Sequence, residues 1–113
     1  MSIKSPPHSQ EAEASVLGSM IADSSCIPVV KSVIDSSMFY NSSCRKLFEL
    51  VSDMSDDNIT IDLVSVCSAI TPSMKESGVT PYFVSNLVTE SLVENYEFHS
   101  NIVRDKFLLR NII

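Results

Sequence analysis

Signals that start helices recur along this sequence, and each is followed by apolar residues at helical spacing. Ser, Thr, Asn and Asp side chains cap the free N–H groups at the start of a helix. Such residues precede apolar stripes at Ser9, at Ser24 or Ser25, at Asn41 or Ser42, at Asp62 and at Thr80. The one β-like run, residues 59–61, is too short to predict a strand. The pattern therefore predicts an all-α fold.

These signals place the predicted helices along the chain. We expect helices over residues 9–23, 26–35, 42–54, 63–70 and 80–88, with the third burying Leu47, Phe48, Val51 and Met54. In the second, Val29, Val30, Val33 and Ile34 form the predicted buried stripe. Thr71-Pro72 is expected to stop the fourth helix and to leave residues 73–79 as a loop. The expected architecture is a compact orthogonal bundle of about five to six helices.

The stretch from Pro6 to Ile21 resembles the lip of an active site but is better explained as a helix start. Pro6 and Pro7 cannot lie inside a helix, and Ser9 is a good cap. Glu11 and Glu13 lie in the first turn, where the helix dipole favours negative charge. They point about 200° apart and cannot share a substrate. Val16 and Leu17 then begin the buried face.

The last segment, residues 93–113, is apolar over more of its circumference than one core face requires. One apolar group comprises Val93, Tyr96, Val103 and Phe107, and the other comprises Phe98, Ile102, Leu109 and Ile113. We therefore predict that Ile102, Leu109 and Ile113 face a partner helix. The pattern reaches Ile113 without a cap or a stop signal, so we expect the helix to continue beyond this sequence.

Charge and composition limit the kinds of partner that this chain can bind. The chain of 113 residues suits one domain, and its net charge of −6 comes without any cluster of Lys or Arg. We therefore expect no direct nucleic-acid binding. Cys26, Cys44 and Cys67 lack a CxxC spacing, so we interpret them as reduced thiols that pack as small hydrophobic side chains. No signal peptide or membrane span is visible, so a cytoplasmic location without membrane contact is expected.

The sequence carries no catalytic motif. Its two glycines, Gly18 and Gly78, cannot form a phosphate-binding loop. His8, expected in a turn, and His99 lack the spacing of a metal pair. We therefore predict that this chain has no catalytic, cofactor-binding or metal-binding residues. Phe39-Tyr40 is either an exposed aromatic anchor for a partner or part of the core.

Several stretches in register resemble the N-terminal domain of DnaB-type bacterial replicative DNA helicases. The resemblance extends from Pro7 to Ile113, without a diagnostic motif at any single place. The matching residues are Pro7 to Ser9, Glu11 to Glu13 and Val16 to Gly18; Phe39-Tyr40, Arg45 and Leu47 to Glu49; Ile61 to Val66; and Asn95 to Glu97, Ile102 to Lys106, Arg110 and Ile112-Ile113. The chain departs from the family pattern at Cys44, Val79 and Ser91, which affects the expected loop paths near Gly78 and Ser91.

The resemblance implies a domain division and a function. It implies a flexible lead over residues 1–8, a helical head over 9–92, and the first arm of a helical hairpin, truncated, over 93–113. Hairpins would pair between subunits to build a hexamer and receive primase, and a loader would act on the ring. Self-association would then involve Phe98, Ile102, Phe107, Leu109 and Ile113. ATP and Mg²⁺ would bind only a motor domain absent from this sequence.

Other residues have expected structural roles, and two alternative functions remain open at this level. The structural set comprises Ser9, Glu11, Val16, Leu17, Phe39, Tyr40, Phe48 and Asp62. One alternative is the helicase-binding domain of a primase, which is similar in fold but usually lacks the opening from Pro7 to Gly18. The other is a small metal-dependent hydrolase using His8, His99 and acidic residues.

Overall fold

The computed structural model describes residues 6–112, and over that range it contains helices and no strand. The α-helices are α1 (Gln10–Ala22), α2 (Ile27–Val33), α3 (Ser42–Asp56), α4 (Leu63–Ala69), α5 (Pro72–Glu76), α6 (Pro81–Glu90) and α7 (Tyr96–Ile112). Short 3-10 turns are η1 (Ser24–Cys26), η2 (Ser36–Met38) and η3 (Val93–Asn95). The predicted all-α class is confirmed, with one helix more than expected.

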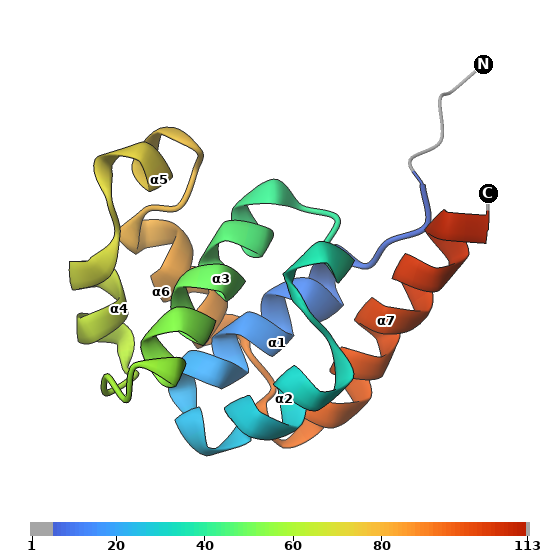
Figure 1. The fold of residues 1–113 in the computed structure, drawn as a ribbon, viewed down its shortest axis with the longest axis horizontal. Coiled ribbons are helices and arrows are strands. Elements are labelled where there is room, and N and C mark those ends of the chain that lie inside the picture. Colours follow the sequence, from blue (N-terminus) through green and yellow to red (C-terminus); the bar gives the residue numbers. More distant parts are fainter. Residues whose placement is uncertain (1–5, 113) are drawn as a thin grey trace.

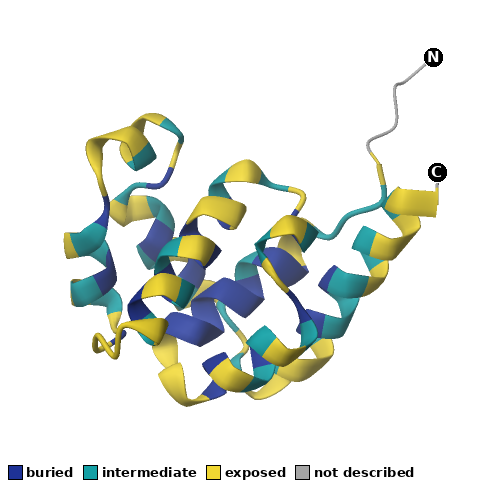
Figure 2. Ribbon diagram, viewed as in Figure 1, coloured by how far each residue is buried: buried dark blue, intermediate teal, exposed yellow. Residues whose placement is uncertain are grey.

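Helix α1 forms the centre of the fold. It packs against α6, α7 and α3, and it also contacts α2 and α4 (Figure 1). Val16, Leu17 and Met20 are fully buried, and α1 is the most continuously buried helix in Figure 2. Its closest neighbour is α6, because a Cβ atom built on Gly18 would lie 2.1 Å from the carbonyl oxygen of Leu87. Only glycine allows the two helices to approach so closely.

Four of the predicted N-caps are present. The hydroxyl of Ser9 accepts a hydrogen bond from Ala12 N, and that of Thr80 accepts one from Phe83 N. Asn41, rather than Ser42, caps α3 by accepting from Cys44 N at 3.0 Å. Asp62 accepts from Ser65 N, and the Ser65 hydroxyl accepts from Asp62 N in return. These caps fix where α1, α3, α4 and α6 begin.

Two predicted segments differ from the structure. Residues 73–79 are not wholly a loop, because Thr71 caps a further helix, α5, by accepting from Met74 N at 3.2 Å. Thr71-Pro72 thus starts a helix, as Thr80-Pro81 does. The helix predicted over residues 26–35 is shorter in the structure, where α2 ends at Val33 because Ile34 is extended. A 3-10 turn precedes it, and its cap is Asp23 rather than a serine.

Most predicted apolar stripes face the core. Leu47, Phe48, Val51 and Met54 of α3 are buried as expected. In the segment of α2, Ile27, Val30 and Ile34 are buried, whereas Val29 and Val33 are only half-buried. Phe39 is fully buried, so it is part of the core, whereas Tyr40 is 39% exposed and its role as an anchor for a partner stays a prediction.

Glu13 has a role that its position in the first turn did not reveal. Glu11 is exposed, but Glu13 is 1% exposed, and its carboxylate accepts hydrogen bonds from Tyr40 N at 2.9 Å and Asn41 N at 3.1 Å. The interpretation of both residues as partners of their own helix dipole is therefore incomplete. Glu13 also receives the N–H groups at the start of α3 and so joins α1 to α3.

No single described helix is long and apolar enough to cross a membrane. Residues 10–33, taken as a pair of helices bent by 114°, reach the required length and composition together. Their apolar side chains include Val16, Leu17, Ile27 and Val30, which lie in the protein core.

Candidate functional site

Helix α7 has one side in the core and one side open. Val103 and Ser100 are buried, and Tyr96 packs against the core, so this side faces α1 and α2. Phe98 and Leu109 are 11 residues apart, which is close to three turns at about 3.6 residues per turn, so they share one side of the helix. This side faces away from Val103. Phe98 and Leu109 are 67% and 45% exposed. The helix therefore keeps apolar side chains outside the core, as its broad apolar pattern predicts.

The five self-association candidates do not share one environment. Ile102 is partly buried and packs against the core, which departs from the prediction that it faces away from it. Phe107 is half-buried, with the Arg110 guanidinium 5.8 Å from its ring centroid. Ile113 lies outside the described residues. Only Phe98 and Leu109 are therefore placed on the open side.

Ile112 joins these two residues although it was not among the candidates. It is 80% exposed and follows Leu109 by three positions, which places it on the same side of α7. The signal was present in the sequence as this spacing. We call Phe98, Leu109 and Ile112 the outer stripe of α7.

Arg110 fixes the C-terminal half of α7 to the head. Its Nη1 donates to the carbonyl oxygen of Pro7 at 2.9 Å, and its Nη2 donates to that of Met38 at 2.7 Å. The guanidinium also lies 5.4 Å from the ring centroid of Tyr40. The resemblance identified Arg110 but no sequence pattern indicated its acceptors, because backbone carbonyls carry no residue-specific signal.

His8 belongs to the same group of contacts. Its ring stacks on Tyr40 with centroids 4.2 Å apart, and its Nδ1 lies 2.8 Å from the carbonyl oxygen of Pro6. Tyr40 therefore contacts both His8 and Arg110, which joins the lead into α1 to the end of α7. This packing accounts for His8 without catalysis.

His99 is tied to α1 through Ser15. The hydroxyl of Ser15 accepts from Leu92 N at 3.2 Å, so its own proton is available to His99 Nδ1 at 3.0 Å. A cavity of about 290 Å³ lies beside them, with Glu11 and Glu90 in its lining. Within residues 6–112, however, no three His, Cys, Asp or Glu side chains are grouped to hold a metal ion. The hydrolase alternative therefore gains no support from this site.

The three cysteines are free, and burial makes them less acidic. Burial, with a smaller effect of nearby Glu13, raises the pKa of the Cys44 thiol to about 12. Burial, with a smaller effect of Asp23, raises the pKa of Cys26 to about 11. The pKa of Cys67 is also raised by burial. A nucleophilic cysteine needs the opposite shift, so these thiols act as packing groups.

Comparison with known proteins gives a consistent result. The family described as "DnaB-like helicase N terminal domain" matches residues 5–105. The replicative DNA helicase DnaC of Bacillus subtilis is 29% identical over 110 residues, which cover 96% of this chain and 24% of that protein. The replicative DNA helicase DnaB of Rhodothermus marinus is 27% identical over 109 residues, covering 95% and 12%. The chain thus spans a quarter or less of the length of these relatives.

A solved structure supports the fold. The crystal structure of the N-terminal domain of DnaB helicase from Mycobacterium tuberculosis superimposes with a TM-score of 0.84 at 23% sequence identity. The match covers 96% of this chain and 80% of that one. The two chains therefore share the arrangement of helices over nearly the whole sequence.

Proposed function

Because this chain belongs to the family of DnaB-like helicase N-terminal domains, we propose that it is the assembly and primase-docking domain of a hexameric replicative DNA helicase. The domain performs no chemistry itself. ATP and Mg²⁺ are used by a motor domain in the longer helicase, and the protein works in the cytoplasm. Residues 9–92 form the head, and residues 93–113 belong to the first arm of a hairpin.

The outer stripe of α7 carries this proposal. Its members, Phe98, Leu109 and Ile112, are 67%, 45% and 80% exposed, although α7 is otherwise docked on the head. Exposed apolar side chains that recur along one side of a helix, rather than singly, are typical of surfaces that another chain covers. A second copy of the domain is the proposed partner, and primase docks on the collar formed by the paired arms.

Family membership separates this proposal from the primase alternative. The matching family and the relatives named above are replicative helicases. The acidic net charge of −6 also favours a role in protein contacts over direct contact with nucleic acid.

Sedimentation of matched variants tests the proposal. The chain extended by about 40 residues, the length of a second hairpin arm, should associate more strongly than the 113-residue chain. In the extended chain, Phe98→Glu with Leu109→Glu should abolish association and the binding of a primase helicase-binding domain. Tyr82→Glu with Val64→Glu is the control, because these side chains are 77% and 76% exposed and lie outside α7. Equal association by both double variants and the parent would contradict the proposal.

A further inference from the structure

The outer stripe of α7 has a charged residue at its centre. Phe98, Asp105 and Ile112 follow one another at intervals of seven residues, and Leu109 lies between the last two. Seven residues make close to two turns of an α-helix, so Asp105 lies on the same side as the apolar members. It is exposed, with 66% of its side chain accessible. This side of α7 is therefore apolar towards both ends and acidic in the middle.

Basic residues flank Asp105. Arg104 precedes it and Lys106 follows it, and because successive residues of a helix are about 100° apart, they lie on either side of Asp105. Arg104 Nε is 3.9 Å from Asp105 Oδ1, near the outer limit for an ion pair. Within residues 6–112, Lys106 forms no ion pair. A second copy of α7 would bring the same two charges in reciprocal positions, so this surface can be complementary to itself.

The charge decides the direction in which two copies pair. In a parallel pair along a seven-residue pattern equal positions meet, so the two Asp105 carboxylates would face and repel each other. In an antiparallel pair, Phe98 can pack on Leu109 of the second copy, which sets Asp105 opposite Ile102 of that copy. Lys106 is four residues from Ile102 and so lies one turn further along the same side. Side chains tilt towards the N-terminus of their own helix, so Asp105 and Lys106 of the second copy lean towards each other.

We propose that Asp105 sets an antiparallel register between α7 and α7 of a second copy, by bonding to Lys106 of that copy. The inference rests on the proposed function, because it specifies how the outer stripe is covered. Phe98 and Leu109 supply the apolar contact, and a two-fold axis makes the ion pair occur twice. A polar residue within an apolar seam specifies register in the same way in coiled coils.

Disulfide cross-linking of the 113-residue chain tests the register. Cys67→Ala is the background, since Cys67 is only partly buried whereas Cys26 and Cys44 are buried. Phe98→Cys and Leu109→Cys are made in separate chains. Oxidation of their equal mixture should give at least about tenfold more dimer than oxidation of either variant alone. In this register identical positions lie about 16 Å apart along the helix axis, and cysteines more than about 7 Å apart are not bridged.

Charge variants in the same mixture test Asp105. Asp105→Lys in both chains should lower the yield of mixed dimer about tenfold, because it places a second cation beside Lys106 of the other copy. Asp105→Lys with Lys106→Asp exchanges the two charges and should restore the parent yield. A role of Asp105 confined to its own helix would not be restored by this exchange.

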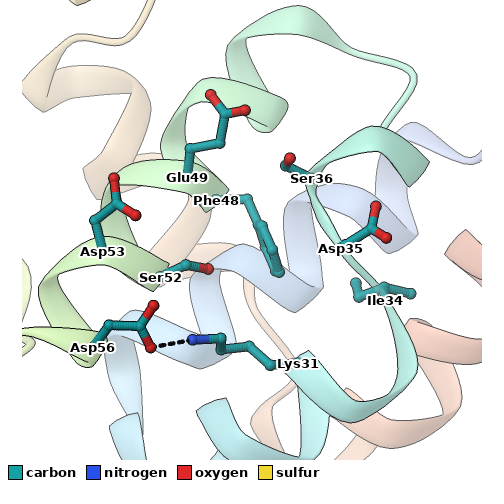
Figure 3. A pocket seen from close by; sticks show the side chains of 9 residues that line it. All are labelled: Lys31, Ile34, Asp35, Ser36, Phe48, Glu49, Ser52, Asp53 and Asp56. Carbon is teal, nitrogen blue, oxygen red and sulfur yellow. Dashed lines mark hydrogen bonds and ion pairs between the residues drawn. The ribbon is translucent and has the colours of Figure 1, made fainter.

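The matched control for charge lies on α3 rather than α7. Asp53 is exposed beside a cavity of about 450 Å³ between α3 and residues 31–36, and its side chain points away from that cavity (Figure 3). The charged pair in the cavity is Lys31 and Asp56, at 2.6 Å. Asp53→Lys makes the same change of charge as Asp105→Lys and should leave the yield of mixed dimer unchanged.

The possible results separate this inference from the proposed function. Cross-linking of Phe98→Cys alone as strong as in the mixture would overturn the antiparallel register. An unchanged yield with Asp105→Lys, an equal loss with Asp53→Lys, or no restoration by the exchange variant would overturn the role of Asp105. Absence of any cross-linked dimer would overturn the whole inference, while sedimentation of the extended chain would still decide the proposed function.

Discussion

The carboxylate of Glu13 lies 3.1 Å from the backbone nitrogen of Asn41, a residue 28 positions further along the chain. Its other oxygen accepts from Tyr40 N at 2.9 Å. The buried charge is thus bonded to two N–H groups at the start of α3, where the helix dipole also favours it. The Glu13 side chain therefore ties the beginning of α1 to the beginning of α3.

Replacing the Glu13 carboxylate should destabilise the fold. We expect Glu13→Gln to lower the free energy of unfolding by about 1.5–3 kcal/mol, because hydrogen bonds to a charged acceptor are lost. Glu11→Gln, at an exposed position of the same turn, should change it by less than about 0.5 kcal/mol. Urea denaturation followed by circular dichroism measures both. Equal free energies of unfolding for the two variants would show that the hydrogen bonds of Glu13 do not stabilise the fold.

Adding one methyl group at position 18 should also destabilise the fold. In an open helix, Gly→Ala stabilises by up to about 1 kcal/mol. Here the new Cβ would lie 2.1 Å from Leu87 O and 2.7 Å from Ser91 Cβ, so α1 and α6 must separate. We expect Gly18→Ala to lower the free energy of unfolding by about 2 kcal/mol or more. A thermal melt with an unchanged or higher midpoint would contradict this close approach.

Loss of Arg110 should loosen the end of α7 without unfolding the head. Arg110→Ala removes the bonds to Pro7 O and Met38 O, so amide exchange in residues 106–112 should accelerate about tenfold, as for one or two lost hydrogen bonds. Arg104→Ala is the control, because among residues 6–112 its ion-pair partner is only Asp105, at 3.9 Å on the surface. Hydrogen exchange by mass spectrometry distinguishes them. Identical exchange in both variants would exclude the anchoring role.

The buried thiols should make stability fall at alkaline pH. Cys26 and Cys44 have pKa values of about 11 and 12 in the fold, raised from 9.0 by burial. Below about pH 9 both states keep the proton, so these thiols add no pH dependence. Above it the unfolded chain loses protons that the folded chain retains, and stability decreases up to the folded pKa values.

Denaturation midpoints at pH 8 and pH 10 measure this effect. Cys44→Ala should show a smaller loss between the two pH values than the parent, whatever its stability at pH 8. Cys67→Ala is the matched control, since Cys67 is only partly buried. An unchanged pH dependence in Cys44→Ala would rule out the thiol as its source.

Local signals in the sequence predicted most of the helices but few of the contacts between them. Ser9, Asn41, Asp62 and Thr80 cap helices within three residues of themselves, so each cap is visible in the sequence. Helix α5 was missed because Thr71-Pro72 both stops one helix and starts the next.

Long-range partners leave no local pattern. The bond from Tyr40 N to Glu13 spans 27 positions, and the cavity lined by Phe48 and Asp35 depends on how α3 packs beside residues 31–36. Among the self-association candidates, Ile102 packs against the core, and the periodicity of α7 does not reveal which of its apolar residues the core covers. The spacing of Phe98, Leu109 and Ile112 is visible in the sequence, but which side of α7 stays open is known only from the structure.

The contacts of Arg110 can form only late in the synthesis of the chain. Its acceptors lie 103 and 72 positions earlier in the chain, so both leave the ribosome well before Arg110 does. A chain is made and folds from its N-terminus, so the helices before α7 leave the ribosome first. The part of the core that Val103 covers is then still exposed. Until α7 has left the ribosome, the core residues that Val103 covers therefore stay accessible to water and to chaperones.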